Sequence, residues 1–150
     1  MDQDIIVRHI REEELDDLLA LYTHLHSKDD PLPPMSDLVV VWHDTMHNPL
    51  LHYFITEYRG IIVSSCCLVI VPNLTHGARP FGLIENVVTH SDYRKKGCAT
   101  ALLKHALDFA WTADCHKVML LSGVERTEAH SMYERLGFNR YSKIGYEAKP

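Results

Sequence analysis

The segment from Phe81 to Gly123 most constrains the fold, because it predicts a strand–helix–strand crossover. It begins with the strand pattern "FGLIENVVTH" and passes through a short loop into a helix predicted from about Gly97 to Trp111. The apolar face of this helix is formed by Ala99, Leu102, Leu103, Ala106 and Ala110. The next stretch, "KVMLLSG", is nearly all apolar and predicts a short strand buried on both faces. Strands joined by such a crossover lie parallel in one sheet, so the chain needs sheet and helix layers.

The rest of the chain predicts more strands and helices around this crossover. Residues 5–10 predict a strand, 11–26 a helix, and 36–47 a second helix capped by Ser36, with Leu38, Val41, Trp42 and Met46 as its apolar stripe. "LHYFITEY" and "IIVSSCCLVIV" predict a β-hairpin with its turn at Arg59-Gly60. "RTEAHSMYERL" predicts a late helix ended by Gly137, and "FNRYSKIGYEA" a last strand. We expect a single mixed α/β domain over residues 1–150, with a mostly antiparallel central sheet, a parallel β-α-β crossover and helices on both faces.

Composition narrows the class of protein. The hydrophobic content is 46%, yet no apolar run approaches the roughly 20 residues of a membrane span. The acidic N-terminus lacks the basic and apolar regions of a signal peptide, so we expect a cytoplasmic protein with no membrane partner. Proteins that bind nucleic acids usually present a basic face, so a net charge of -5 argues against a nucleic-acid partner.

The sequence predicts no metal site and no disulfide. Four cysteines lack any CxxC spacing, and free buried thiols are expected at Cys66, Cys67, Cys98 and Cys115. His43 and His47 share a helix face at i,i+4 and could supply two metal ligands. No third ligand completes an HExxH-like set around them.

A basic cluster opens the helix of the crossover. Arg94, Lys95 and Lys96 precede Gly97 at a helix start, where free backbone N–H groups and the helix dipole favour an anion. A phosphate ligand would explain both the cations and the glycine, whereas a solvated basic turn would explain the cations alone. The segment matches neither the P-loop nor the Rossmann fingerprint.

Two motifs resemble one family, the GNAT superfamily of acetyl-CoA-dependent N-acetyltransferases. "RKKGCA", residues 94–99, is similar to the family's [RQ]-x-x-G-x-[GA] motif, and "AHSMYERLGF" resembles its tyrosine-bearing late helix. The resemblance implies the acyl-CoA N-acyltransferase fold, with a sheet splayed at the strand over 84–89, and acetyl-CoA as co-substrate without a metal. Within the superfamily, "IENVV" is similar to a segment of glucosamine-6-phosphate N-acetyltransferases, although Asn86 replaces their second acid. "ERTEAHSMYERLGF" resembles a bacterial subgroup that includes aminoalkylphosphonate acetyltransferases.

The resemblance assigns roles to particular residues. It implies that main-chain groups of Val87, Val88 and Thr89 pair with the pantetheine arm. The backbone from Lys95 through Thr100, together with Arg94, would hold the pyrophosphate; these residues are Arg94, Lys95, Lys96, Gly97, Cys98, Ala99 and Thr100. Arg126 could reach a phosphate or pantetheine carbonyl, or be a solvated helix-start arginine. Tyr133 corresponds to the tyrosine that protonates the departing thiolate; as a core aromatic it would have no such role.

The predicted strand "FGLIENVVTH" contains a further candidate for a catalytic residue, Glu85. An acid inside an apolar run is costly to bury unless it is paired or used, and an alkylammonium must lose a proton before it attacks a thioester. Glu85 could be the general base, a ligand of the substrate ammonium, or a solvent-facing residue. Strand alternation predicts Ile84 and Asn86 on one face, and Glu85 and Val87 on the other.

We therefore expect an N-acetyltransferase for the primary amine of a small molecule. One alternative is a peptide amine as acceptor, drawn by Asp29, Asp30 and Asp37; another is a silent domain that binds acyl-CoA as a sensor. Edge pairing by the predicted last strand could make a homodimer, an arrangement common in the superfamily.

Overall fold

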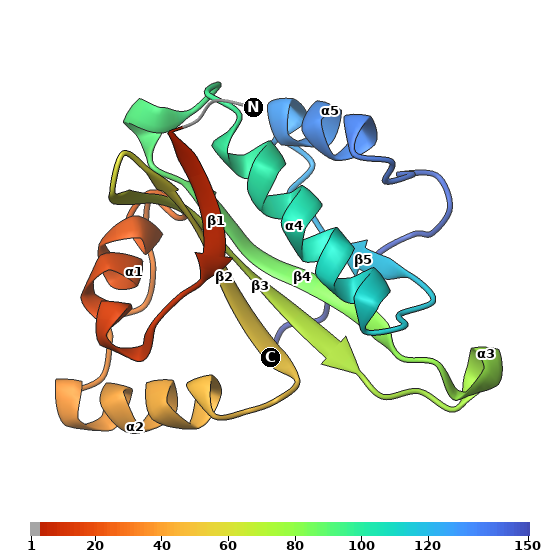
Figure 1. The fold of residues 1–150 in the computed structure, drawn as a ribbon, viewed down its shortest axis with the longest axis horizontal. Helices are drawn as coiled ribbons and strands as arrows, with labels where there is room; N and C mark the ends of the chain where they lie inside the picture. Colours follow the sequence, from red (N-terminus) through yellow and green to blue (C-terminus); the bar gives the residue numbers. More distant parts are fainter. Residues whose placement is uncertain (1–3) are drawn as a thin grey trace.

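The computed structural model describes residues 4–150; residues 1–3 of the predicted domain lie outside the described residues. The strands are β1 (Ile5–His9), β2 (Leu51–Tyr58), β3 (Ile61–Val71), β4 (Phe81–Thr89) and β5 (Val118–Leu120). The α-helices are α1 (Leu15–Tyr22), α2 (Met35–Met46), α3 (Thr75–Ala78), α4 (Cys98–Thr112) and α5 (Thr127–Arg135), with 3-10 turns η1 (Glu12–Glu14) and η2 (Ser91–Tyr93). The five strands lie in the order β1-β2-β3-β4-β5, antiparallel except for the parallel pair β4–β5 (Figure 1). This confirms the mixed α/β fold and the parallel crossover.

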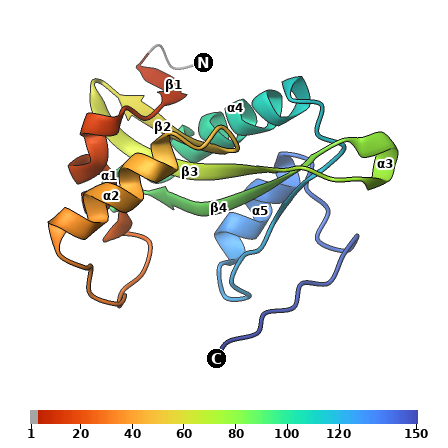
Figure 2. The same ribbon diagram turned by 90° about the horizontal axis from the view of Figure 1, so that it is seen from below.

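Two apolar clusters show that helices cover both faces of the sheet. Phe54, on one face of β2, packs in a cluster with Leu102, Leu103 and other residues of α4. Its neighbour Ile55 points to the opposite face and packs with Leu18 of α1 and Trp42 of α2. Figure 2 shows α4 on one side of the strands and α5 on the other side, below β4.

The hairpin turn has the backbone that its sequence predicts. Arg59 and Gly60 both have positive φ, at 51° and 81°, as a two-residue turn between twisted strands requires. The four cysteines are buried and form no disulfide with one another, as expected. Among residues 4–150, no helix has the length and apolarity needed to cross a membrane.

The second helix differs from its prediction. It begins at Met35 after Pro34, and the Ser36 hydroxyl provides no cap and lies 3.4 Å from the Asp37 carboxylate. Pro34 is the N-cap residue, and because its side chain cannot accept a hydrogen bond, the helix begins without a side-chain cap. Trp42 is buried, but Val41 is 59% exposed, because the helix rests on the sheet along a narrower stripe than expected.

The C-terminal strand and the burial of β5 were predicted wrongly. Residues 138–148 form no strand, and Tyr141, Ile144 and Tyr146 are 87%, 79% and 88% exposed. β5 pairs only with β4, and its three residues are half-buried and not enclosed on both faces. The homodimer was expected to form by edge pairing of the C-terminal strand, which is absent. The homodimer stays a prediction.

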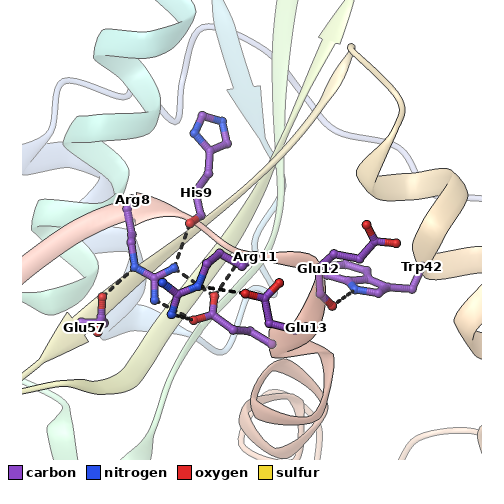
Figure 3. A network of polar contacts seen from close by, with 8 residues as sticks. Arg8, His9, Arg11, Glu12, Glu13, Trp42 and Glu57 are labelled. Atoms are coloured by element: carbon purple, nitrogen blue, oxygen red, sulfur yellow. Dashed lines mark hydrogen bonds and ion pairs between the residues drawn. The ribbon is translucent and has the colours of Figure 1, made fainter.

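A network of ion pairs fastens β1 to η1 and β2 (Figure 3). Arg8 lies between two carboxylates, 2.7 Å from Glu14 and 2.6 Å from Glu57, and Arg11 approaches Glu14 to 2.7 Å. Glu14 also accepts the backbone N–H of Arg11 at 2.8 Å and is buried. The hydrogen bond from Arg8 is the main reason that the pKa of Glu14 falls to about 2.

Glu14→Gln tests this network. Because the folded-state pKa lies below the unfolded value, the ionised carboxylate stabilises the fold above about pH 4.5, and this contribution disappears as the pH falls toward 2. We expect the substitution to lower the free energy of unfolding by about 2 kcal/mol at pH 7 and by roughly half of that or less near pH 3. Urea unfolding at both pH values measures this. Glu13→Gln is the matched control, since the Glu13 side chain is 74% exposed; an equal loss in both variants would contradict the assignment.

Candidate active site

A β-bulge re-aims β4 where the candidate site begins. Val88 pairs with Ser65 and Glu85 with Cys67, so two β4 residues, Asn86 and Val87, oppose the single residue between their partners on β3. Asn86 has a φ of 53°, a conformation that asparagine tolerates better than most residues. Beyond Ile84, β4 has no pairing with β5, so one edge of its C-terminal half faces no strand. This separation is the splay that the family resemblance implies.

The bulge corrects the predicted faces of β4. Val87 packs against the cluster that contains Ile84 and α4, so it does not share a face with Glu85. Simple alternation fails because the extra residue, Asn86, shifts the pleat by one position. Glu85 instead continues a cross-strand row from Tyr53 through Cys67.

The splayed edge opens into a cleft of about 650 Å³ that we call the α4–α5 cleft. Its walls are the end of β4, the loop and first turn of α4, and α5. It brings together most of the predicted cofactor residues and Tyr133; those lining it are Val87, Val88, Thr89, Arg94, Lys95, Gly97, Cys98, Ala99, Thr100, Arg126 and Tyr133. Lys96 and Glu85 do not line it.

The start of α4 has the features of an anion seat. Its N-cap is Gly97, with a φ of 81°, and no side chain caps the first turn. The first N–H groups of a helix have no partner within the helix, so at this end they are available to a ligand in the cleft. A Cβ built on Gly97 would have no atom within 4 Å, which leaves the approach to these amides open.

The three cations of the loop lie in different environments. Arg94 donates hydrogen bonds at 3.4 Å to the carbonyl oxygens of Thr89 and His24, which hold the loop against β4 and the end of α1. The Lys95 ammonium lies 3.4 Å from the Glu128 carboxylate, with both side chains about 80% exposed. The Lys96 ammonium sits over the rings of Tyr93 and Tyr58, at 4.9 Å and 5.6 Å from their centroids. Only Arg94 and Lys95 of the three line the cleft.

Tyr133 is positioned by the core and reaches the cleft. It is 6% exposed, and its ring packs on Phe138 at a centroid distance of 6.0 Å. Burial raises the pKa of its hydroxyl, and the charge of Arg126 partly offsets this. The hydroxyl therefore carries its proton at neutral pH, as a general acid must.

Glu85 belongs to a row of polar side chains on the face of the sheet that α1 and α2 cover. Glu85 is exposed, and its charge helps to raise the pKa of the neighbouring Cys67 thiol to about 11, after the larger effect of burial. Tyr53 and Tyr22 share this region, and burial is the main reason that their pKa values are raised. Hydroxyl groups, a thiol and one carboxylate thus lie on the side of β4 opposite to Val87.

Sequence reasoning missed part of the cleft wall. His24 and Leu25, just after α1, line the cleft, and the His24 ring packs at a tilt against the His90 ring, at a centroid distance of 4.1 Å. Tyr93 and Met132 also line it. The motif spacing places Tyr93 beside the basic loop, but no local pattern indicates that His24 meets a strand that ends 65 residues later.

A second cavity, of about 730 Å³, lies among α1, β1 and the β2–β3 turn. Arg8 and Arg11 line it, but their guanidinium groups already pair with Glu14 and Glu57. Guanidinium groups that are already paired with carboxylates are poor partners for the phosphates of a ligand. The α4–α5 cleft is therefore the better candidate for an anionic nucleotide ligand.

Comparison with known proteins agrees with this architecture. Residues 13–138 match the model of the Acetyltransferase (GNAT) family, and the chain belongs to that family. It is accordingly an acyltransferase of a family that uses acetyl-CoA.

The relatives that this chain resembles are named for different acetyl acceptors. A glucosamine 6-phosphate N-acetyltransferase from Trypanosoma brucei brucei is 30% identical over 93% of this chain and 92% of its own length. A structure of a putative acetyltransferase from Agrobacterium tumefaciens superimposes with a TM-score of 0.89, at 35% identity, over 97% of this chain and 99% of that one. N-alpha-acetyltransferase 30 from Xenopus laevis is 28% identical over 95% of this chain, which spans 50% of that protein.

Proposed function

We propose that this acetyltransferase transfers the acetyl group of acetyl-CoA to the primary amine of a small molecule. The observation that carries the proposal is the α4–α5 cleft, which joins an uncapped helix start at Gly97 to a buried, protonated tyrosine at Tyr133. The similarity of nearly the whole chain to a glucosamine 6-phosphate N-acetyltransferase supports a small acceptor.

We assign one part of the cleft to each part of acetyl-CoA, the acetyl donor. The first turn of α4 would hold the pyrophosphate through backbone N–H groups from Lys95 to Thr100, with Arg94 fixing the loop. The free edge of β4 at Val87, Val88 and Thr89 would pair with the amide groups of the pantetheine arm, as an added strand does. Arg126 lies at the N-cap of α5 on the cleft wall, where it would bind the pantetheine arm or a phosphate. When bound, acetyl-CoA supplies the thioester that the amine attacks.

Two side chains would then handle protons. Tyr133 would give its hydroxyl proton to the leaving sulfur. Glu85 would either take a proton from the amine or hold the substrate as its ammonium; these two roles remain distinct alternatives. Its exposure on the face opposite to Val87 supports approach of the acceptor from the side of α1 and α2.

Glu85→Gln separates these roles, because the amide keeps the shape but can neither accept a proton nor balance an ammonium. A general base predicts a fall in kcat of about 100-fold with the KM for the amine nearly kept. An ammonium ligand predicts a higher KM for the amine with kcat nearly kept. Steady-state kinetics from pH 6 to pH 9 on the purified variant distinguish them, with CoA affinity as the control. Kinetic constants equal to those of the wild type would remove Glu85 from the site.

The acceptor class is tested by competition. Purified protein is incubated with acetyl-CoA and two equimolar sets of acceptors, small primary amines including amino sugars and their phosphates, and peptides with free N-termini. Mass spectrometry of the products should show acetylation mainly in the first set. Acetylation mainly of peptides would favour the second candidate, which the likeness to N-alpha-acetyltransferase 30 supports. CoA binding without any acetylated product would favour a sensor domain.

A further inference from the structure

The fold adds a third metal-ligand candidate to the histidine pair of α2. Glu12 of η1, His43 of α2 and His47 just after α2 each place a ligand atom within 4.8 Å of those of the other two. Within residues 4–150, no other group of three such side chains meets this condition. The sequence indicated only the two histidines, because Glu12 lies 31 residues before His43 in the chain.

Core packing, not surface contact alone, fixes this arrangement. The indole Nε1 of Trp42 donates a hydrogen bond to the Glu12 carbonyl oxygen at 2.8 Å (Figure 3), and Trp42 is buried in the cluster with Ile10 and Leu18. Since His43 follows Trp42 directly, the bond that holds η1 against α2 also holds Glu12 beside His43. The backbone that carries the three side chains is therefore prearranged.

Side-chain contacts orient the imidazoles. His43 Nδ1 lies 2.7 Å from Glu12 Oε1, and the two rings have centroids 4.0 Å apart. His47 Nδ1 lies 2.8 Å from the His43 carbonyl oxygen, where it donates a hydrogen bond and leaves Nε2 free. A histidine whose second nitrogen donates to a carbonyl is the usual arrangement of a metal-ligating imidazole.

We propose that Glu12, His43 and His47 form a binding site for a divalent transition metal, with zinc as the best fit. Two imidazoles and a carboxylate are a common protein ligand set for tetrahedral zinc, and water would complete it. Mg²⁺ and Ca²⁺ prefer oxygen ligands alone, so neither suits this set. All three side chains are exposed, so rotation about their own bonds can bring their ligand atoms, which lie within 4.8 Å of one another, around a single ion.

The site is separate from the proposed acetyl transfer. None of its three residues lines the α4–α5 cleft. A bound metal would join η1 to α2 and so stabilise the fold in proportion to its affinity. Metal binding and CoA binding can therefore succeed or fail independently.

The test uses the full chain free of any affinity tag, titrated with Zn²⁺ by calorimetry and by thermal unfolding. We expect one zinc per chain and a rise in Tm that EDTA reverses. Glu12→Gln keeps a hydrogen-bond acceptor for His43 but is a poor ligand, and His47→Ala removes a ligand; each should weaken zinc binding about tenfold or more. His26→Ala, which removes an exposed histidine outside the site, should bind as the wild type does.

Cobalt absorption then identifies the ligands. Co²⁺ bound here should give only weak visible bands, whereas a site built on the buried cysteines would give an intense near-ultraviolet thiolate band. Equal zinc affinity in the wild type and both ligand variants, a thiolate band, or no saturable binding to the wild type would each overturn the proposal. Unfolding midpoints of the variants in EDTA verify that they remain folded.

Discussion

Tyr133→Phe should lower kcat by about 100-fold while CoA affinity stays within about twofold of the wild type. The substitution keeps the ring that packs in the core and removes only the hydroxyl, which burial holds in its protonated form. Steady-state release of free CoA measures kcat, and calorimetry measures the affinity.

The control for this prediction is Tyr141→Phe, which removes a hydroxyl from a residue that is 87% exposed in the C-terminal segment. It should have the activity of the wild type. Unchanged turnover in Tyr133→Phe would remove this tyrosine from the chemistry and leave it a core residue.

Gly97→Val should weaken CoA binding more than tenfold, whereas Lys95→Ala and Lys96→Ala should each cost up to about 1 kcal/mol, or roughly fivefold. The glycine has a φ of 81°, where a β-branched residue is strained, and any shift moves the amides of the first turn of α4. Lys95 is an exposed charge that already has a partner in Glu128, and Lys96 rests on two tyrosine rings. Calorimetric titration with CoA compares the three variants.

Gly60→Val controls for backbone strain, because Gly60 has the same φ of 81° and also has no atom within 4 Å of a built Cβ. It lies in the β2–β3 turn, so it should lower stability without changing CoA affinity. Losses from the lysine variants that equal or exceed the loss from Gly97→Val would contradict a seat formed by backbone amides.

The parts of the fold that follow from local chemistry were predictable. Arg59-Gly60 indicates a tight turn by residue type, and the pattern around Gly97 indicates both the start of α4 and the family. Gly137 has a φ of 95° just after α5, as its place in the sequence predicts. In each case the interactions that determine the local conformation involve residues that are close together in the chain.

The predictions that were wrong concern segments whose structure depends on contacts between residues far apart in the chain. Residues 138–148 contain the strand-favouring residues Phe138, Tyr141, Ile144 and Tyr146, yet they pair with no strand, although β5 has an open outer edge. The bulge at Asn86 reverses the face of Val87, and nothing in the apolar pattern of β4 indicates an extra residue. Likewise, only the folded chain brings His24 to the cleft and Glu12 to the histidines of α2.

Amide hydrogen exchange with and without CoA shows whether the α4–α5 cleft binds acetyl-CoA. We expect slower exchange at Val87–Thr89, at Lys95–Thr100 and along the first turns of α5, with little change around Arg8 and Arg11. Protection confined to the cavity between α1 and the β2–β3 turn, or no protection at saturating CoA, would contradict binding in this cleft.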